Sequence, residues 1–239
     1  MENYTPFCGA PPIPADLWGR WLFDPALLAG LALLLAGGLW VAQDRRRFAI
    51  GWVVVALLFI SPLCAASIAL FSARVGQHIL LTLVAAPIIA AALPALRLPA
   101  LPLAVLFAVL FWFWHAPVPY QATLMSDAIY WAMHISLFGA AVVLFAALRA
   151  APERGLPAAA LTGAQMTLFA MLLTLAPAPW HGWHLATTTA YGLSALADQQ
   201  LAGGLMWVAG GALFMVSIAG LALRFLNDSG TEPDPTDPR

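Results

Sequence analysis

Imidazole side chains are the groups in this sequence best suited to bind a metal ion. Three of the five histidines, His78, His115 and His134, lie within or at the end of apolar stretches. An ionisable group in such a place is energetically costly, so a functional role is the default interpretation. Imidazole nitrogen is a good ligand for copper, zinc or iron. We therefore treat these three histidines as candidate metal ligands.

Other donors are expected near these histidines. Met133, His184 and Asp198 are secondary candidates for the same site. A methionine thioether favours Cu(I), which makes copper the metal that this set predicts. The alternative interpretation is structural, because methionines usually fill gaps in packing and histidines at helix ends often only hydrogen-bond a neighbouring helix. The sequence leaves both interpretations open.

A stripe of polar side chains runs along one predicted helix. Asp127, Tyr130 and His134 are spaced by three and four residues, so they share one face of that helix. A carboxylate on this face could fix the tautomer of the imidazole, as supporting groups do at metal sites. Arg74 and His78 are likewise one helical turn apart in an earlier segment.

The composition indicates whether the protein that carries these groups folds in water or in a lipid bilayer. Apolar residues make up 62% of the chain, charged residues only 9%, and the mean hydropathy is +0.87. Such a chain cannot hide its apolar surface in one aqueous core, so it is predicted to be an integral membrane protein in a lipid bilayer. Its net charge of −1 argues against a nucleic-acid partner.

Seven apolar stretches are long enough to cross the hydrocarbon core as helices, which needs about 20 residues each. The predicted fold is therefore an all-α, polytopic membrane protein. The predicted spans are 22–43, 48–70, 76–95, 99–115, 127–148, 157–177 and 200–224.

The arginines predict the orientation of these spans. The chain has no lysine, and eight of its ten arginines fall in alternate connections and in the tail that follows the last span. Only Arg20 and Arg74 are predicted on the opposite side. Because arginine-rich short loops stay cytoplasmic, the N-terminus is expected outside and the C-terminus inside. All five histidines then lie toward the outer face.

Two tails flank the predicted membrane domain, 22–224. Residues 1–21 lack the basic start and apolar core of a signal peptide and are expected to form a short external tail. The Pro- and Asp-rich segment 225–239 is expected to be a disordered cytoplasmic tail. Of the two cysteines, Cys64 is interpreted as a small buried residue, and a disulfide between Cys8 and Cys64 is an alternative in an oxidising compartment.

Several motifs together resemble the CtaG family of caa3-type cytochrome c oxidase assembly factors, over residues from about 20 to 224. The resemblance implies a polytopic protein of the bacterial inner membrane that helps to build a haem–copper oxidase and is linked to copper delivery. Its implied partners are oxidase subunits and a periplasmic copper chaperone. The motifs are Phe23-Asp24-Pro25, Ser61-Pro62-Leu63, the run from Leu70 to His78, Trp114-His115-Ala116-Pro117, the run from Asp127 to His134, and the run from Ala197 to Trp207.

The sequence departs from the family pattern at one turn. The family usually has a His-Met pair one turn before the Gln-His of the third span, and this chain has Arg74-Val75 there. A guanidinium group is permanently charged and cannot ligate a metal. Either Arg74 contacts an anion or a propionate, or copper binding uses only His78, His115 and His134.

Three functional hypotheses follow. The first is an assembly factor that holds or relays copper at the outer face, and the second is a metal-free scaffold that docks an oxidase subunit. The third is a haem-binding redox protein, which the clustering of the histidines near one interface disfavours. The sequence has no phosphate-binding loop, zinc-protease pair or nucleophile elbow, so an enzyme is not expected.

The orientation can be tested with reporter fusions. A reporter that is active only in the cytoplasm should work when fused at Arg46 and at Ser229, because both positions follow arginine-rich segments. Activity of a periplasmic reporter at either position would contradict the predicted topology.

Overall fold

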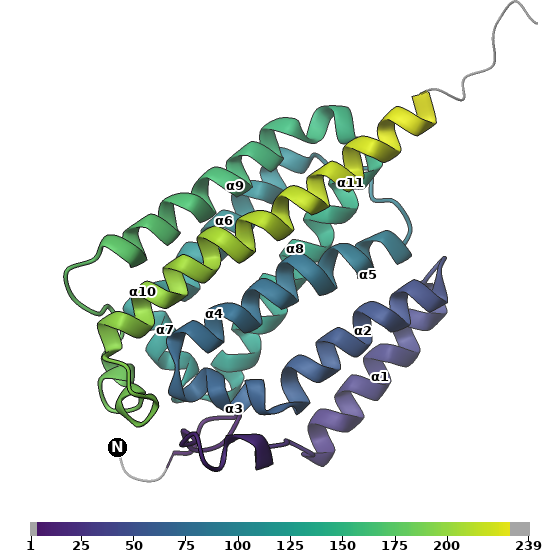
Figure 1. The fold of residues 1–239 in the computed structure, drawn as a ribbon. Coiled ribbons are helices and arrows are strands. Elements are labelled where there is room, and N and C mark those ends of the chain that lie inside the picture. The colour runs from purple at the N-terminus through teal and green to yellow at the C-terminus, as the bar shows by residue number, and fades with distance from the viewer. Residues whose placement is uncertain (1–3, 230–239) are drawn as a thin grey trace, which may run out of the picture.

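Helices form all of the regular structure in residues 4–229, which are the residues that the computed structural model describes. This confirms the all-α prediction for that part of the chain. Figure 1 shows the long helices side by side in one bundle. The helices are α1 Pro25–Val41, α2 Arg45–Ile60, α3 Pro62–Ala69, α4 Phe71–Leu80, α5 Ala86–Ala92, α6 Ala100–His115, α7 Pro117–Thr123, α8 Asp127–Ala150, α9 Pro152–Leu175, α10 Ala195–Leu205 and α11 Gly211–Ser229.

Four helical segments are long and apolar enough to span a membrane. Two of them contain a π-helical turn: η2, Leu81–Ala85, joins α4 to α5, and η5, Met206–Gly210, joins α10 to α11. The other two are α8 and most of α9. Two bent pairs, α2 with α3 and α6 with α7, raise the number of candidate spans to six if each pair is one span. The shorter apolar helix α1 has 17 residues, so the seventh span stays a prediction.

Prolines explain both bent pairs. The bend between α2 and α3 is 52° at Ser61, and Pro62 is the first residue of α3. The bend between α6 and α7 is 76°, and Pro117 is the first residue of α7. Proline lacks the N–H group that continues a helix and disfavours a helical conformation in the residue before it. The predicted span 48–70 is therefore two helices with different directions.

Two helices begin five residues earlier than predicted. Helix α4 begins at Phe71 rather than at residue 76, so Arg74 lies inside a helix and not in a connection. Helix α10 begins at Ala195 rather than at residue 200, because the Ser194 side chain accepts a hydrogen bond from the Ala197 N–H. At the C-terminal end, α11 continues to Ser229, and residues 230–239 of the predicted tail lie outside the described residues.

The two ends of the bundle differ in charge. The N-terminal segment and the connection between α9 and α10 lie at one end (Figure 1), where the Tyr191 hydroxyl donates a hydrogen bond of 3.0 Å to the Pro12 carbonyl. At the other end the connection before α2 meets the end of α5, and Arg149 donates a hydrogen bond of 2.6 Å to the Leu93 carbonyl. This arginine-rich end is the one that the sequence predicts to face the cytoplasm.

A disulfide joins the N-terminal segment to the bundle. Cys8 and Cys64 are bonded, with Cα atoms 5.4 Å apart, and both are buried. Phe7 stacks on Tyr130 with ring centroids 5.1 Å apart. The alternative prediction of a disulfide between Cys8 and Cys64 is therefore confirmed. The segment predicted to be an external tail is packed, from Tyr4 onward, against α3 and α8.

The outside of the bundle is apolar. Leu33, Trp40 and Val208 are each more than 70% exposed, and many other large apolar side chains lie on the same surface. Water would disfavour such a surface, whereas lipid chains are as apolar as these side chains. The surface therefore supports a multi-pass membrane protein.

Adjacent glycines in α10 provide a test of the packing between α9 and α10. A Cβ atom at Gly203 would lie 2.3 Å from Thr174 Oγ1 and 2.8 Å from the Ala170 carbonyl oxygen, whereas a Cβ atom at Gly204 would meet nothing within 4 Å. Gly203→Ala should destabilise the folded state by about 1–3 kcal/mol through overpacking. Gly204→Ala is the matched control and should not lower the thermal unfolding temperature in detergent; equal unfolding temperatures for both variants would contradict this packing.

Candidate metal-binding site

Three histidines from three helices meet inside the bundle. His78 on α4, His115 at the end of α6 and His134 on α8 are all buried. The centroid of the His78 ring is 5.5 Å from that of His115 and 5.1 Å from that of His134. The structure therefore brings together the three histidines that the sequence singled out.

The helix backbone orients two of these rings. The Nδ1 atom of His115 is 2.7 Å from the Phe111 carbonyl, and the Nδ1 atom of His134 is 2.9 Å from the Tyr130 carbonyl. A carbonyl oxygen only accepts hydrogen bonds, so each Nδ1 atom is the protonated donor. The Nε2 atom of each ring then carries the lone pair that a metal ion requires.

Several nitrogens of this cluster have no partner. Neither ring nitrogen of His78 makes a hydrogen bond, and neither does Nε2 of His134, although all three atoms are buried. Leaving a buried polar atom unsatisfied costs about 1–3 kcal/mol, so each such atom calls for a physical explanation. A ligand at these nitrogens would supply the missing interactions.

A small cavity lies beside two of the imidazoles. It has a volume of about 20 Å³. This is enough for a water molecule, which needs about 10–15 Å³. The lining residues are Val75, His78, Ile79, Thr82, Phe107, Phe111, His115, Leu137, Met166 and Met206.

Histidine, cysteine and acidic side chains do not form a complete metal site as they stand. Within residues 4–229, no three of these side chains converge closely enough to hold one ion. The cavity beside His78 and His115 is also lined by two methionines, Met166 and Met206.

Arg74 is a fully buried cation one turn before His78. Its Nε atom donates to the Ser67 carbonyl at 3.2 Å and its Nη1 atom to Thr123 Oγ1 at 3.1 Å. The guanidinium carbon also lies 5.3 Å from the centroid of the Tyr120 ring, at cation–π distance. Its Nη2 atom makes no hydrogen bond. This positive charge disfavours a second cation nearby, more strongly for a divalent than for a monovalent ion.

Asp198 binds the start of α4. Its carboxylate accepts hydrogen bonds from the Phe71 N–H at 2.6 Å, from the Ser72 N–H at 3.2 Å and from the Ser72 hydroxyl. A carboxylate at this place satisfies backbone donors that the first turn of a helix leaves unpaired. The oxygens of this secondary metal candidate are thus engaged in positioning α4.

His184, another secondary candidate, is held by protein groups. Its Nδ1 atom is 3.2 Å from the Ala69 carbonyl and its Nε2 atom is 2.7 Å from the Tyr120 hydroxyl, so the hydroxyl donates to Nε2. Burial lowers the pKa of His184 to about 4. Burial, reinforced by the charge of His184, lowers the pKa of His181 to about 3. Both histidines of this connection are therefore neutral at physiological pH.

The remaining candidates lie around His134. Met133 is fully buried on α8, and its role as a ligand stays a prediction. Asp127 is exposed, and its carboxylate accepts a hydrogen bond from the Tyr4 hydroxyl. The Tyr130 carbonyl, rather than the Asp127 carboxylate, orients the His134 ring. The Tyr130 ring lies 4.2 Å from the His134 ring, and its hydroxyl lies 3.3 Å from the Cys8 sulfur. The disulfide thus packs one residue away from the histidine cluster.

The Asp198 contact predicts a change in stability. Asp198→Ala should lower the thermal unfolding temperature in detergent, because it leaves two backbone N–H groups of α4 unpaired at about 1–3 kcal/mol each. Asp127→Ala is the matched control, since Asp127 is an exposed acid in the first turn of α8. An Asp198→Ala protein as stable as the control would show that this contact does not hold α4.

The family comparison identifies the class of protein. A protein-family model described as cytochrome c oxidase caa3 assembly factor (Caa3_CtaG) matches residues 27–228, which include the three histidines. No curated protein and no solved structure matches the chain. Because the match covers most of the sequence, this chain belongs to the Caa3_CtaG family of cytochrome c oxidase assembly factors.

Proposed function

We propose that this protein helps to assemble a haem–copper cytochrome c oxidase by holding copper at His78, His115 and His134 and relaying it to an oxidase subunit. The observation that carries the proposal is the cluster of three buried imidazoles with unpartnered nitrogens. Family membership supplies the link to oxidase assembly and indicates a non-catalytic role. Copper is the cargo of the protein.

The chemistry of the site suits Cu(I). Neutral imidazoles are good ligands for copper, and the two rings fixed by helix carbonyls present their Nε2 lone pairs. The buried charge of Arg74 favours a monovalent ion over a divalent one. The site also lacks a thiolate, because Cys8 and Cys64 are bonded to each other. A site of this kind can bind copper and still release it.

The proposed orientation places the disulfide end of the bundle outside. Disulfides persist in oxidising compartments such as the bacterial periplasm. The arginine-rich end, with the connection before α2 and Arg149, then faces the cytoplasm of a bacterial inner membrane. Copper would arrive at the outer face from a periplasmic copper chaperone.

A haem-binding function has less support. Haem ligation needs space for a macrocycle against an imidazole, and the cavity beside His78 and His115 has a volume of only about 20 Å³. The rings of His78 and His134 are in edge contact, with an interplanar angle of 76°. A metal-free scaffold that docks an oxidase subunit is the alternative that the experiment must separate from copper binding.

Copper binding to purified variants tests the proposal. The wild-type protein should bind Cu(I) in competition with a coloured chelator and show no Soret band. Alanine substitution of His78, His115 or His134 should weaken the binding about tenfold or more, since even the loss of a supporting group has an effect of this size at metal sites. His184→Gln is the control, because both nitrogens of His184 already have protein partners.

The same variants should lower oxidase activity in cells. Cells without the protein should still make the oxidase subunits but contain less active oxidase. In cells with an alanine variant, added copper should partly restore oxidase activity, because a weakened site fills again by mass action. Full oxidase activity and copper content in all three alanine variants, at normal protein levels, would leave the scaffold as the remaining function.

A further inference from the structure

We propose that Met166 and Met206 complete the copper site with two thioether ligands, and that copper leaves this site sideways, through a lipid-facing groove between α9 and α11. The inference rests on the proposed copper-holding function and adds to it a ligand set and a direction of release. It starts from the place of these two methionines, which line two different cavities.

The first of these cavities contains the imidazoles. Met166 and Met206 are both buried, and both line the small cavity beside His78 and His115. His78 has two unpartnered ring nitrogens. The donors around this cavity are thus two imidazoles and two thioethers, which is a set that favours Cu(I). Among residues 4–229, no three His, Cys, Asp or Glu side chains are placed to hold one ion, and the two thioethers are the further donors that this cavity offers.

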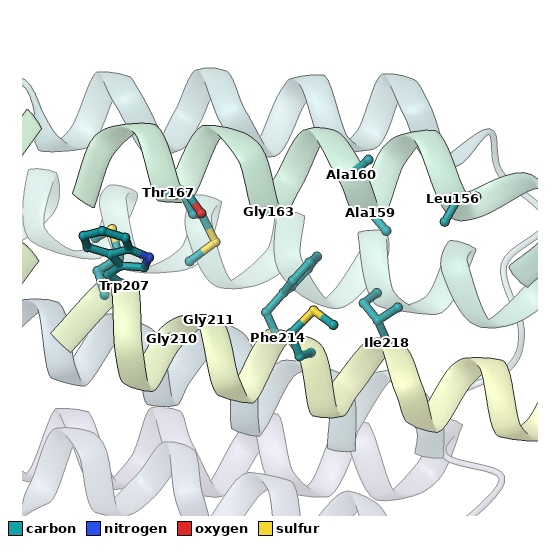
Figure 2. Close-up of a pocket in the computed structure, with 13 residues that line it drawn as sticks. Leu156, Ala159, Ala160, Gly163, Thr167, Trp207, Gly210, Gly211, Phe214 and Ile218 are labelled. Carbon is teal, nitrogen blue, oxygen red and sulfur yellow. The ribbon is translucent and has the colours of Figure 1, made fainter. Parts of the chain in front are cut away.

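The second cavity is a groove of about 400 Å³ on the outside of the bundle. Figure 2 shows its two walls, with Ala159 and Gly163 on α9 facing Gly210 and Phe214 on the opposite helix. The residues that line it are Leu156, Ala159, Ala160, Gly163, Met166, Thr167, Met206, Trp207, Gly210, Gly211, Phe214, Met215 and Ile218. Met166 and Met206 therefore separate the groove from the histidines.

The local backbone keeps this boundary thin. Met206 begins the π-helical turn η5, and such turns interrupt the regular hydrogen bonds of a helix. Gly210 ends this turn and Gly211 begins α11, and a Cβ atom at Gly211 would meet nothing within 4 Å. The wall that η5 and α11 contribute to the groove therefore carries no side chains at Gly210 and Gly211. The flexible thioether side chains fill the space between the groove and the histidine cavity.

This route fits an acceptor that is itself a membrane protein. Copper that passes from the imidazoles to the thioethers moves toward the groove without crossing water. The buried positive charge of Arg74, one turn before His78 on α4, disfavours a cation close to it. A family of oxidase assembly factors serves such an acceptor.

Leucine substitutions test the thioether ligands. Leucine has nearly the volume of methionine but no donor atom, so the bundle should stay folded. The double variant Met166→Leu, Met206→Leu should bind Cu(I) about tenfold or more weakly, as for other lost groups at metal sites. Its X-ray absorption spectrum should lack the sulfur scattering expected for the wild type. Met215→Leu is the control, because Met215 lines the groove but not the histidine cavity.

A second pair of variants tests the route. Gly211→Leu should narrow the groove and slow the removal of Cu(I) by an apolar chelator severalfold, with little change in equilibrium affinity. Gly204→Leu is the control, since its Cβ atom also meets nothing within 4 Å but Gly204 does not line the groove. Equal removal rates in these two variants would overturn the sideways route.

The outcomes separate the two proposals. If the wild-type protein binds no Cu(I), the copper-holding function fails and the thioether site fails with it. If the wild type binds Cu(I), the histidine variants lose it and the leucine variants keep the wild-type affinity and spectrum, only the thioether site is wrong.

Discussion

The hydrogen bonds from the start of α4 to Asp198 are the interaction on which the rest of the site depends. Helix α4 follows a break at Leu70, and its first N–H groups have no partner within the helix. The Asp198 carboxylate on α10 satisfies Phe71 and Ser72 together, so it determines both the position and the rotation of α4. Arg74 and His78 follow on the same helix, and their places inside the bundle are set by this contact.

The buried polar groups are of two kinds, those with hydrogen-bond partners and those without. Gln77 donates to the Leu58 carbonyl, and His184 has protein partners on both ring nitrogens. His78 and His134, in contrast, keep buried nitrogens without partners. In the hydrocarbon core there is no water to form a hydrogen bond with an unsatisfied polar group. Such groups therefore persist where a ligand supplies the missing interaction. The proposed copper site is therefore placed at the unpaired imidazoles of His78 and His134, although the buried ring nitrogens of His181 also lack partners.

The proposed connection between the lipid-facing surface and the site depends on small and apolar side chains rather than on charged ones. The groove between α9 and α11 is lined mainly by small and apolar residues, and Met166 and Met206 line both this groove and the cavity beside His78 and His115. A proline-dependent bend and two π-helical turns interrupt the helices around the cluster. Each interruption changes the direction of the side chains that follow it, compared with a straight helix. Neighbouring helices cover the turn η2, whereas Trp207 and Val208 of η5 are exposed on the outside of the bundle.

The sequence by itself determined the membrane environment, the all-helical fold and the location of His78, His115 and His134 in apolar segments, since hydropathy and helical spacing are local properties. It did not determine how the helices face one another. The early start of α4 depends on Asp198, which lies 127 residues away from Phe71. The predicted third span, 76–95, therefore left Arg74 outside the helix in which it lies. Only the tertiary structure decided these points, because the partner that satisfies a buried group is chosen by packing between helices distant in the chain.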